Sequence, residues 1–347
     1  MPSRVALLGY GLAGSVFHAP FITTTAGLEL AVVVTGNDDR KAQALSEHPG
    51  VTVLPTSDEV WERAAELDLV VVATPDSSHV PLARAALDAG LPVVVDKPLA
   101  RSAPEGRALV EAARERGLML TVFQNRRWDG DFLTLRRLLH DGRLGRVHRF
   151  ESRFERWRPQ VGSGWRERPG AGEAGGLLYD LGSHLVDQAL QLFGGVRDVY
   201  AEVDVRRDGA VADDDDFLAL EHESGVRSQL WMSALAADRA PRFRVLGDRA
   251  AFVKHGLDVQ EEALRAGRSP ADPDWGEEPR ERWGRLVTDG EVQEVPTEPG
   301  SYGSFYTGVA RSLRDSVPPP VDPRDSLAAL EVLDAARELG RVWRNMD

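Results

Sequence analysis

The first third of the chain is a series of short apolar runs that alternate with segments of helical composition. The apolar runs, rich in Val and Leu, cover 4–9, 28–35, 67–74, 92–98 and 118–124. The segments between them, rich in Ala, Leu, Glu or Arg, cover 15–25, 40–47, 57–65, 79–89 and 103–116. Strands that alternate with helices form parallel sheets, because each helix returns the chain to the same edge. The pattern therefore predicts an α/β fold with a doubly wound parallel sheet over residues 1–124.

From about residue 125 the pattern changes to an alternation of period two. It is clearest in 199–207, 217–235 and 284–295, the last of which contains an Asp289-Gly290 turn. Such alternation is typical of an antiparallel sheet with one solvent-exposed face. It predicts a second domain over 125–347, which closes on an amphipathic helix. Because sheets of this kind often pair through the exposed face, we expect a homodimer or homotetramer.

Length, charge and cysteine content restrict the classes of function. The chain has 347 residues, which suits two domains, and a net charge of −13, which disfavours nucleic acid as a partner. It has no cysteine, which excludes disulfides, thiolate nucleophiles and Cys-ligated metals, so redox chemistry would require a bound cofactor. No apolar run is long enough for a bilayer, and the first residues lack a signal-peptide profile. We therefore expect a cytoplasmic protein without a membrane partner.

The acidic run Asp213–Asp216 stands between two predicted strands. We expect it to be a solvated loop rather than a metal site, since hard cations need spaced oxygens that converge. No metal site is predicted elsewhere in the sequence.

A glycine motif follows the first predicted strand. The segment Gly9-Tyr10-Gly11-Leu12-Ala13-Gly14 matches the GxGxxG pattern and precedes a predicted helix. The first glycine permits the tight turn, the second lets the backbone approach a pyrophosphate, and the third allows close helix packing. We therefore expect Gly9, Gly11, Leu12, Ala13 and Gly14 to bind a dinucleotide.

The end of the second predicted strand bears on the choice between NAD and NADP. A carboxylate there accepts a hydrogen bond from the ribose 2′-hydroxyl of NAD and repels the 2′-phosphate of NADP. The sequence places Gly36 at this position, between Thr35 and Asn37, with Arg40 nearby. This favours NADP, whereas a turn one residue longer would give the carboxylate role to Asp38 and favour NAD.

Two further segments carry residues suited to proton transfer. Lys97 ends an apolar strand, and ligands bind beyond the carboxyl ends of parallel strands. Asp180 and His184 lie one helical turn apart in the segment 175–188, just after the pair Gly175-Gly176. Oxidation of an alcohol removes the hydroxyl proton as the hydride leaves, which suits a histidine oriented by a carboxylate. A lone histidine on an amphipathic helix is usually structural, but the glycine pair leaves these groups accessible.

Taken together, six segments resemble the glucose-fructose oxidoreductase / inositol dehydrogenase / MocA (Gfo/Idh/MocA) family, and within it the NADP-dependent scyllo-inositol dehydrogenase branch. They are GYGLAGSVFHAP, VVVATPDSSH, VVVDKPLA, FQNRRWDGDF, FERWRPQVGSGWRE and GGLLYDLGSHLVDQALQLFG. The resemblance implies an N-terminal Rossmann domain, a C-terminal α/β domain with an open, mostly antiparallel sheet, and hydride exchange with sugars or polyols. It places the catalytic lysine on Lys97, and the catalytic Asp and His on Asp180 and His184.

The resemblance also extends the set of predicted contacts. Predicted cofactor contacts beyond the glycine motif are Thr35, Gly36, Asn37, Arg40, Thr74, Pro75, His79, Asp96, Lys97 and Asn125. Predicted substrate contacts are Lys97, Asn125, Trp165, Tyr179, Asp180, His184 and Tyr302. The sequence departs from the family at Asp96, where Glu is usual, and at Asp76, where Asn is frequent.

Some of these residues allow a second interpretation. Trp157, Trp165, Tyr179, Tyr302 and Tyr306 provide a stacking face for a polyol or belong to the core. His18 packs in the interior or contacts the cofactor, and His79 is expected to cap its helix.

The sequence thus predicts an oxidoreductase that transfers hydride between NADP(H), or NAD(H), and a cyclic polyol or sugar. One alternative is a non-catalytic sugar or dinucleotide sensor on the same fold. Another is a sugar-modifying enzyme that oxidises its substrate only transiently.

Overall fold

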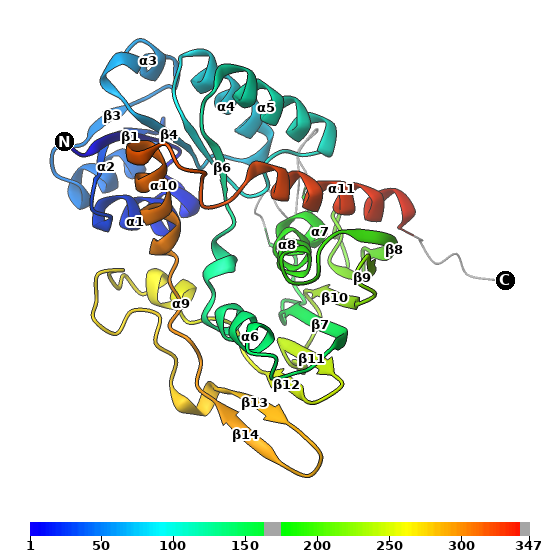
Figure 1. Cartoon of the computed structure of the whole chain (residues 1–347). Coiled ribbons are helices and arrows are strands. Elements are labelled where there is room, and N and C mark those ends of the chain that lie inside the picture. The colour runs from blue at the N-terminus through cyan, green and yellow to red at the C-terminus, as the bar shows by residue number, and fades with distance from the viewer. Residues whose placement is uncertain (163–174, 341–347) are drawn as a thin grey trace. The chain divides into compact units, whose positions relative to one another are not determined.

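The computed structural model describes residues 1–162 and 175–340, which form two compact units (Figure 1). The first contains 1–128, 260–275 and 301–327, and the remaining described residues make up the second. The chain thus returns twice to the first unit after residue 128, a feature that the two contiguous ranges expected from the sequence do not include.

The first unit is built on a six-stranded parallel sheet of order β3-β2-β1-β4-β5-β6. Its strands are β1 (Ser3–Leu8), β2 (Leu28–Val34), β3 (Thr52–Leu54), β4 (Leu69–Val72), β5 (Val93–Asp96) and β6 (Leu120–Phe123). Every neighbouring pair is parallel, which confirms the doubly wound sheet. Strand β3 was not predicted, because three residues are too few to show a period.

Helices cover both faces of this sheet, with α4 and α5 on one face and α1 and α10 on the other (Figure 1). The helical elements are η1 (Ala13–His18), α1 (Ala19–Thr24), α2 (Asp38–Glu47), α3 (Asp58–Trp61), η2 (Ala64–Glu66), η3 (Asp76–Ser78), α4 (His79–Asp88), α5 (Ala103–Arg116), η4 (Asn125–Trp128), α9 (Gln260–Arg265) and α10 (Gly303–Asp315). The segment 15–25, expected to be helical, falls largely within the π-helix η1 and the α-helix α1 that follows it. Helix α11 (Pro323–Leu339) begins in this unit and ends in the second.

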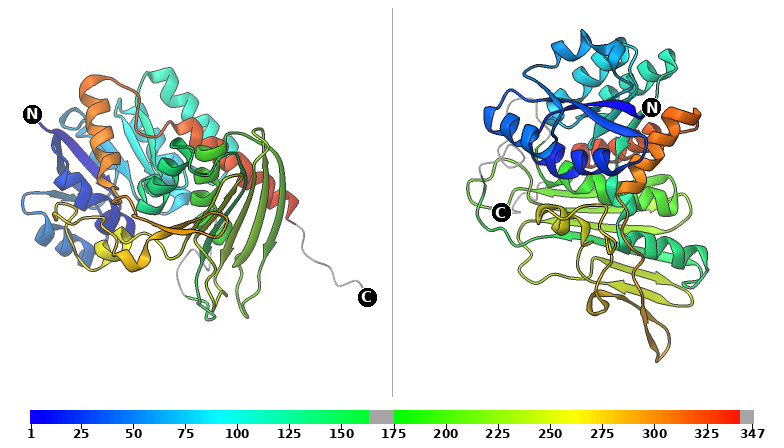
Figure 2. Two further views of the ribbon diagram at one scale, coloured as in Figure 1. Left: turned by 60° about the horizontal axis from the view of Figure 1, so that its bottom comes forward. Right: turned by 90° about the vertical axis from the view of Figure 1, so that its left-hand side faces the viewer.

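The second unit is built on an eight-stranded sheet of order β14-β13-β12-β11-β7-β10-β9-β8, which Figure 2 shows as a curved layer. Its elements are α6 (Gly130–His140), β7 (Val147–Glu155), α7 (Leu177–Asp180), α8 (Gly182–Phe193), β8 (Val196–Asp204), β9 (Asp215–His222), β10 (Arg227–Ser233), β11 (Phe243–Gly247), β12 (Ala251–Lys254), η5 (Arg280–Arg282), β13 (Gly284–Val287) and β14 (Val292–Val295). All neighbouring strands are antiparallel except β7 and β10, so the mostly antiparallel sheet is confirmed.

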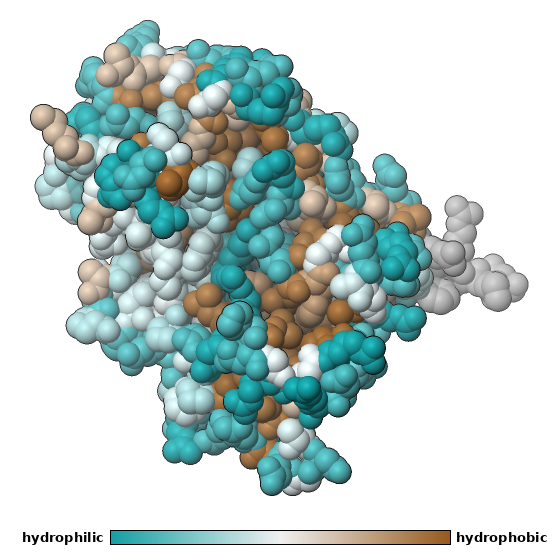
Figure 3. All heavy atoms as spheres, in the orientation of Figure 1, coloured by the Kyte–Doolittle hydropathy of each residue, from teal (hydrophilic) through white to brown (hydrophobic). Residues whose placement is uncertain are grey.

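One face of this second sheet packs against helices α7 and α8, and the other is partly exposed. In β9 every second residue is buried, which is the period-two pattern read from the sequence. The face of the molecule drawn in Figure 3 is mostly hydrophilic, with small groups of hydrophobic residues between the polar ones. None of the helices in the described ranges is long and apolar enough to cross a membrane.

Candidate active site

The glycine turn after β1 has no room for side chains at its first and third glycines. Gly9 has a φ of +95°, and a Cβ there would lie 2.6 Å from the carbonyl oxygen of Ala73. A Cβ at Gly14 would lie 2.0 Å from the carbonyl oxygen of Gly9. Leu12, directly after the second glycine, is 48% exposed. The turn therefore has the close backbone approach and the open side that a dinucleotide pyrophosphate requires.

The end of β2 carries polar groups and a positive charge. Thr35 Oγ1 accepts from Asn37 N at 3.3 Å, and Asn37 Oδ1 caps α2 by accepting from Arg40 N at 3.0 Å. The Arg40 guanidinium lies 3.7 Å from the position that a Cβ on Gly11 would take. It forms no ion pair with any residue in 1–162 or 175–340. Arg40 thus sets an uncompensated positive charge beside the glycine turn, where a 2′-phosphate would bind favourably.

Lys97 follows β5 at the carboxyl edge of the same sheet. Its backbone N–H donates to Asp96 Oδ1 at 2.8 Å, and the Lys97–Pro98 peptide bond is cis. The predicted catalytic lysine is therefore tied to the aspartate that precedes it in the chain.

His79 holds two of the loops at this edge together instead of capping its helix. Its ring is buried, with Nδ1 2.8 Å from the carbonyl oxygen of Pro98 and Nε2 2.9 Å from that of Thr74. The expectation of a helix cap is thus wrong, because both ring nitrogens contact loop carbonyls. His79 joins the loop after β4 to the loop that carries Lys97.

Asn125 follows β6 and is 7% exposed, while the two arginines after it are buried in ion pairs. Arg126 binds Glu261 at 2.7 Å, and Arg127 binds Asp325 at 3.0 Å. These pairs attach the two returning segments to the first unit, so both arginines have a structural role. Gln260 has a similar role: it accepts from the Tyr302 backbone N–H at 2.8 Å and donates to the carbonyl oxygen of Trp128. No sequence signal pointed to Gln260, because its partners come from separate segments.

Asp180 and His184 lie in the second unit, on α7 and at the start of α8. His184 is 5% exposed. Asp180 lines a cavity of about 80 Å³, together with Arg156, Arg158 and Arg207. A cavity with both guanidinium donors and a carboxylate acceptor suits a ligand rich in hydroxyl groups.

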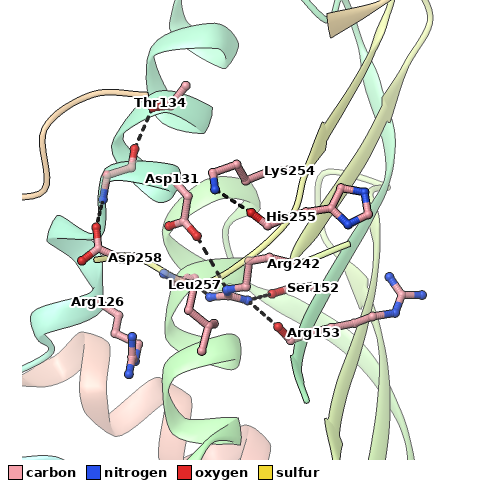
Figure 4. Close-up of polar contacts among 12 residues, drawn as sticks. Arg126, Asp131, Thr134, Ser152, Arg153, Arg242, Lys254, His255, Leu257 and Asp258 are labelled. Carbon is pink, nitrogen blue, oxygen red and sulfur yellow. Dashed lines mark hydrogen bonds and ion pairs between the residues drawn. The ribbon is translucent and has the colours of Figure 1, made fainter. Parts of the chain in front are cut away.

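Helix α8, which carries His184, is anchored by the buried side chain of Arg242. The guanidinium donates to Ser152 Oγ at 2.5 Å and to Gln188 Oε1 at 2.7 Å, and its Nε lies 3.8 Å from Asp131 Oδ2 (Figure 4). Arg242 thus links β7, α6 and α8, which fixes the helix on the sheet.

The acidic run Asp213–Asp216 enters β9 at Asp215, and Asp214 and Asp216 are buried, so the expected solvated loop is wrong. Asp214 is 0% exposed and binds Arg207 at 2.9 Å, and Asp213 Oδ2 accepts from the Leu178 backbone N–H at 2.7 Å. Burial, and then the charge of Asp213, raise the pKa of Asp216 well above its usual value. Among the described residues no group of three His, Cys, Asp or Glu side chains could hold a metal ion. The run instead fixes the start of α7, the helix that ends at Asp180.

Several predicted aromatic contacts prove to be structural. Tyr302 is fully buried against Phe21 in the core of the first unit, so its predicted substrate contact is wrong. The Tyr179 ring is 2% exposed, and its hydroxyl donates to Asp334 Oδ1 at 2.5 Å, so it is not open to a polyol. Trp157 is 52% exposed, and Trp165 lies outside the described residues.

Comparison with known proteins identifies the family. Residues 3–124 match the model of the oxidoreductase family with an NAD-binding Rossmann fold, and residues 132–253 match the GFO/IDH/MocA C-terminal domain. The chain is 35% identical to the scyllo-inositol 2-dehydrogenase (NADP(+)) IolW of Bacillus subtilis, over 99% of this chain and 95% of the relative. It is 40% identical to the uncharacterized oxidoreductase YdgJ of Escherichia coli, over 96% and 95%.

A solved structure agrees with these sequence matches. The structure of the oxidoreductase yvaA from Bacillus subtilis matches with a TM-score of 0.91 and 36% identity, over 97% of this chain and 95% of that one. The chain therefore belongs to the Gfo/Idh/MocA family and is an NAD(P)-dependent oxidoreductase.

Proposed function

We propose that the protein transfers hydride between NADP(H) and a secondary alcohol or ketone of a cyclic polyol or sugar, with an inositol as the first substrate to test. The observation that carries the proposal is the place of Lys97, at the carboxyl edge of the sheet whose first strand leads into the glycine turn. The name of the Bacillus subtilis relative supports a polyol substrate. The Arg40 guanidinium beside the glycine turn supports NADP.

Each candidate residue has a chemical role in this reaction. The glycine turn Gly9–Gly14 would hold the dinucleotide, which would supply the hydride acceptor for the alcohol carbon. His184 takes the hydroxyl proton in the same step, because an imidazole changes charge near neutral pH. Lys97 binds the reacting oxygen and shares its proton, and Asp180 orients both the substrate and the imidazole.

A panel of inositols, aldoses and their lactones tests this function. Inositols and aldoses are incubated with NADP⁺ or NAD⁺, lactones are incubated with NADPH or NADH, and the absorbance of the reduced cofactor is followed. We expect net reduction of NADP⁺ with at least one inositol. The same assay on Lys97→Met and on Ser304→Ala, a variant of α10 outside the site, separates catalysis from background. If no compound reduces either cofactor, the proposal fails.

Two alternatives predict different results in that assay. A non-catalytic sensor would bind cofactor without turnover, but such a protein has no need of Lys97 and His184, which this chain retains. An enzyme that oxidises its substrate only transiently would change the sugar without net reduction of cofactor. We further propose that the protein works in the cytoplasm and forms a homo-oligomer through the half-exposed face of the second sheet. Measuring the mass in solution tests the oligomer.

A further inference from the structure

A chain of three polar side chains, two of them fully buried, ends at the residue before Lys97 in the first unit. His18, from η1, is 0% exposed and lies between Tyr306 of α10 and Asp96 of β5. His18 Nδ1 is 2.6 Å from the Tyr306 hydroxyl, and His18 Nε2 is 3.7 Å from Asp96 Oδ1. The imidazole also packs on Phe123, with 4.6 Å between ring centroids. Nothing in the proposed hydride transfer uses these buried polar groups.

We propose that His18 is a positioning residue that holds the Asp96 carboxylate in place, and through Asp96 orients Lys97 for the reaction. This inference rests on the proposed role of Lys97. It assigns a function to three residues that do not touch the substrate.

The hydrogen-bond geometry assigns the protons in this chain. Burial, and then the charge of Asp96, raise the pKa of Tyr306 well above its usual value, so the phenol keeps its proton. Within the described ranges the Tyr306 hydroxyl bonds only to His18 Nδ1, which therefore accepts that proton. The ring proton then resides on Nε2, 3.7 Å from Asp96 Oδ1, which is an electrostatic contact and longer than a hydrogen bond. If His18 were an imidazolium, its Nδ1 atom would carry a proton and could not accept the hydrogen bond from the Tyr306 hydroxyl.

Asp96 connects this chain to Lys97. Its Oδ1 atom accepts from the Lys97 backbone N–H at 2.8 Å. Burial alone would raise the pKa of Asp96, but the contact with His18 and the charges of His79 and Lys97 outweigh burial, and the pKa is lowered. The titratable groups that face this carboxylate are thus His18, Tyr306, His79 and Lys97. The Asp96 carboxylate therefore fixes the backbone from which the Lys97 side chain extends.

The short side chain of Asp96 brings its carboxylate to both neighbours. Its Oδ1 atom lies 2.8 Å from the Lys97 backbone N–H and 3.7 Å from His18 Nε2. In this arrangement the histidine supplies the contact that fixes the carboxylate.

Steady-state kinetics of His18→Phe, Tyr306→Phe and Asp96→Asn test the proposal, with the polyol that the panel identifies. His18→Phe keeps an aromatic ring against Phe123, and we expect kcat to fall about 10- to 100-fold with KM within about threefold. The acid limb of its kcat profile should move to higher pH, because loss of the His18 contact raises the pKa of Asp96. Tyr306→Phe should cause a smaller fall, and His18→Phe combined with Asp96→Asn should be no worse than Asp96→Asn alone.

A matched control separates this effect from lost packing. Phe305 lies in the same aromatic cluster, 5.3 Å from Tyr306 between ring centroids, and has no polar atom in its side chain. We expect Phe305→Leu to lower Tm while leaving the kcat profile unchanged. If His18→Phe retains the kcat and the profile of the parent, or if Phe305→Leu shifts the profile equally, the inference is wrong. Should His18→Phe not fold, Asp96→Asn and Tyr306→Phe give the same decision.

A spectroscopic measurement needs no substrate. Nitrogen NMR of the protein labelled at histidine distinguishes the two ring tautomers, and the signal missing from His18→Phe identifies His18. We expect the proton on Nε2, and a changed signal in Tyr306→Phe. A His18 proton on Nδ1 would overturn the inference even if the enzyme oxidises an inositol. A parent without turnover but with the expected tautomer would overturn the proposed function instead.

Discussion

Replacement of Gly36 by aspartate should change the cofactor preference from NADP toward NAD. Gly36 follows Thr35 at the end of β2, and a Cβ there would meet only the carbonyl oxygen of Pro55, at 3.6 Å. That distance is an ordinary van der Waals contact, so the local backbone accepts a side chain. Gly9 and Gly14, in contrast, have backbone oxygens 2.6 and 2.0 Å from the position of a Cβ.

Two electrostatic effects set the size of the change. The new carboxylate faces the 2′-phosphate of NADP, and it competes for Arg40, the guanidinium beside the glycine turn. Loss of a charge-assisted contact and gain of a like-charge repulsion are each worth about 1.5 to 3 kcal/mol. Because the two effects share one guanidinium, they do not add fully. One effect alone corresponds to a change of about tenfold, so the ratio of kcat/KM for NADP and NAD should fall at least tenfold.

The assay measures kcat/KM for both cofactors in the parent and in three variants. Gly36→Ala adds a Cβ without charge, and its ratio should stay within about threefold of the parent. Arg40→Gln removes the guanidinium without adding a carboxylate, so it should weaken use of NADP and leave NAD nearly unchanged. A parent that prefers NAD, or a Gly36→Asp variant whose ratio does not move, refutes the argument. If the ratio of kcat/KM for NADP and NAD then changes in Asp38→Asn, Asp38 is the carboxylate that discriminates between the cofactors.

Three further predictions concern catalysis, the glycine turn and the buried carboxylates. In steady-state kinetics, Lys97→Met and His184→Ala should each lower kcat about 10²- to 10⁴-fold. The double variant should lower kcat by much less than the product of the two single decreases, because both groups act on one proton. Gly14→Ala should lower Tm by several degrees or abolish dinucleotide binding, because its Cβ would lie 2.0 Å from the carbonyl oxygen of Gly9. Asp216→Asn should raise the free energy of unfolding by about 1 kcal/mol at neutral pH. Because the pKa of Asp216 is raised in the folded protein, its ionisation lowers the free energy of unfolding only at pH values above the pKa of an ordinary aspartate. The gain from Asp216→Asn should therefore shrink as the pH falls toward 4. An equal gain at pH 4 and pH 8 would contradict this reasoning.

Most of the first unit was predictable because its signals are local. The strands are continuous apolar runs, such as Leu69–Val72, whose four residues are all 0% exposed. The glycine turn and the lysine at the end of β5 are likewise defined by neighbours in sequence. The return of 260–275 and 301–327 was not predictable, because it depends on pairs such as Arg126 with Glu261, which lie 135 positions apart.

The same distinction separates the site residues that were predicted from those that were misassigned. Lys97, Asp180 and His184 were predicted from motifs a few residues long. Tyr179 and Tyr302 were assigned to the substrate because a tyrosine in such motifs has both an aromatic face and a hydroxyl. Whether that hydroxyl is free depends on a residue elsewhere in the chain, as Asp334 shows for Tyr179.

The sequence of the acidic run Asp213–Asp216 also indicated which of its side chains are buried, although its charge suggested a solvated loop. Four consecutive aspartates suggest solvation, because each ionised carboxylate costs free energy when it is buried without partners. Yet Asp214 and Asp216 share the even-numbered positions of Leu218 and Leu220, and the same alternation buries all four. Burial is compensated by donors from other segments, namely the Arg207 guanidinium for Asp214 and the Asp204 backbone N–H for Asp216. Strand periodicity therefore indicated which carboxylates are buried, whereas charge indicated only that each one needs a partner.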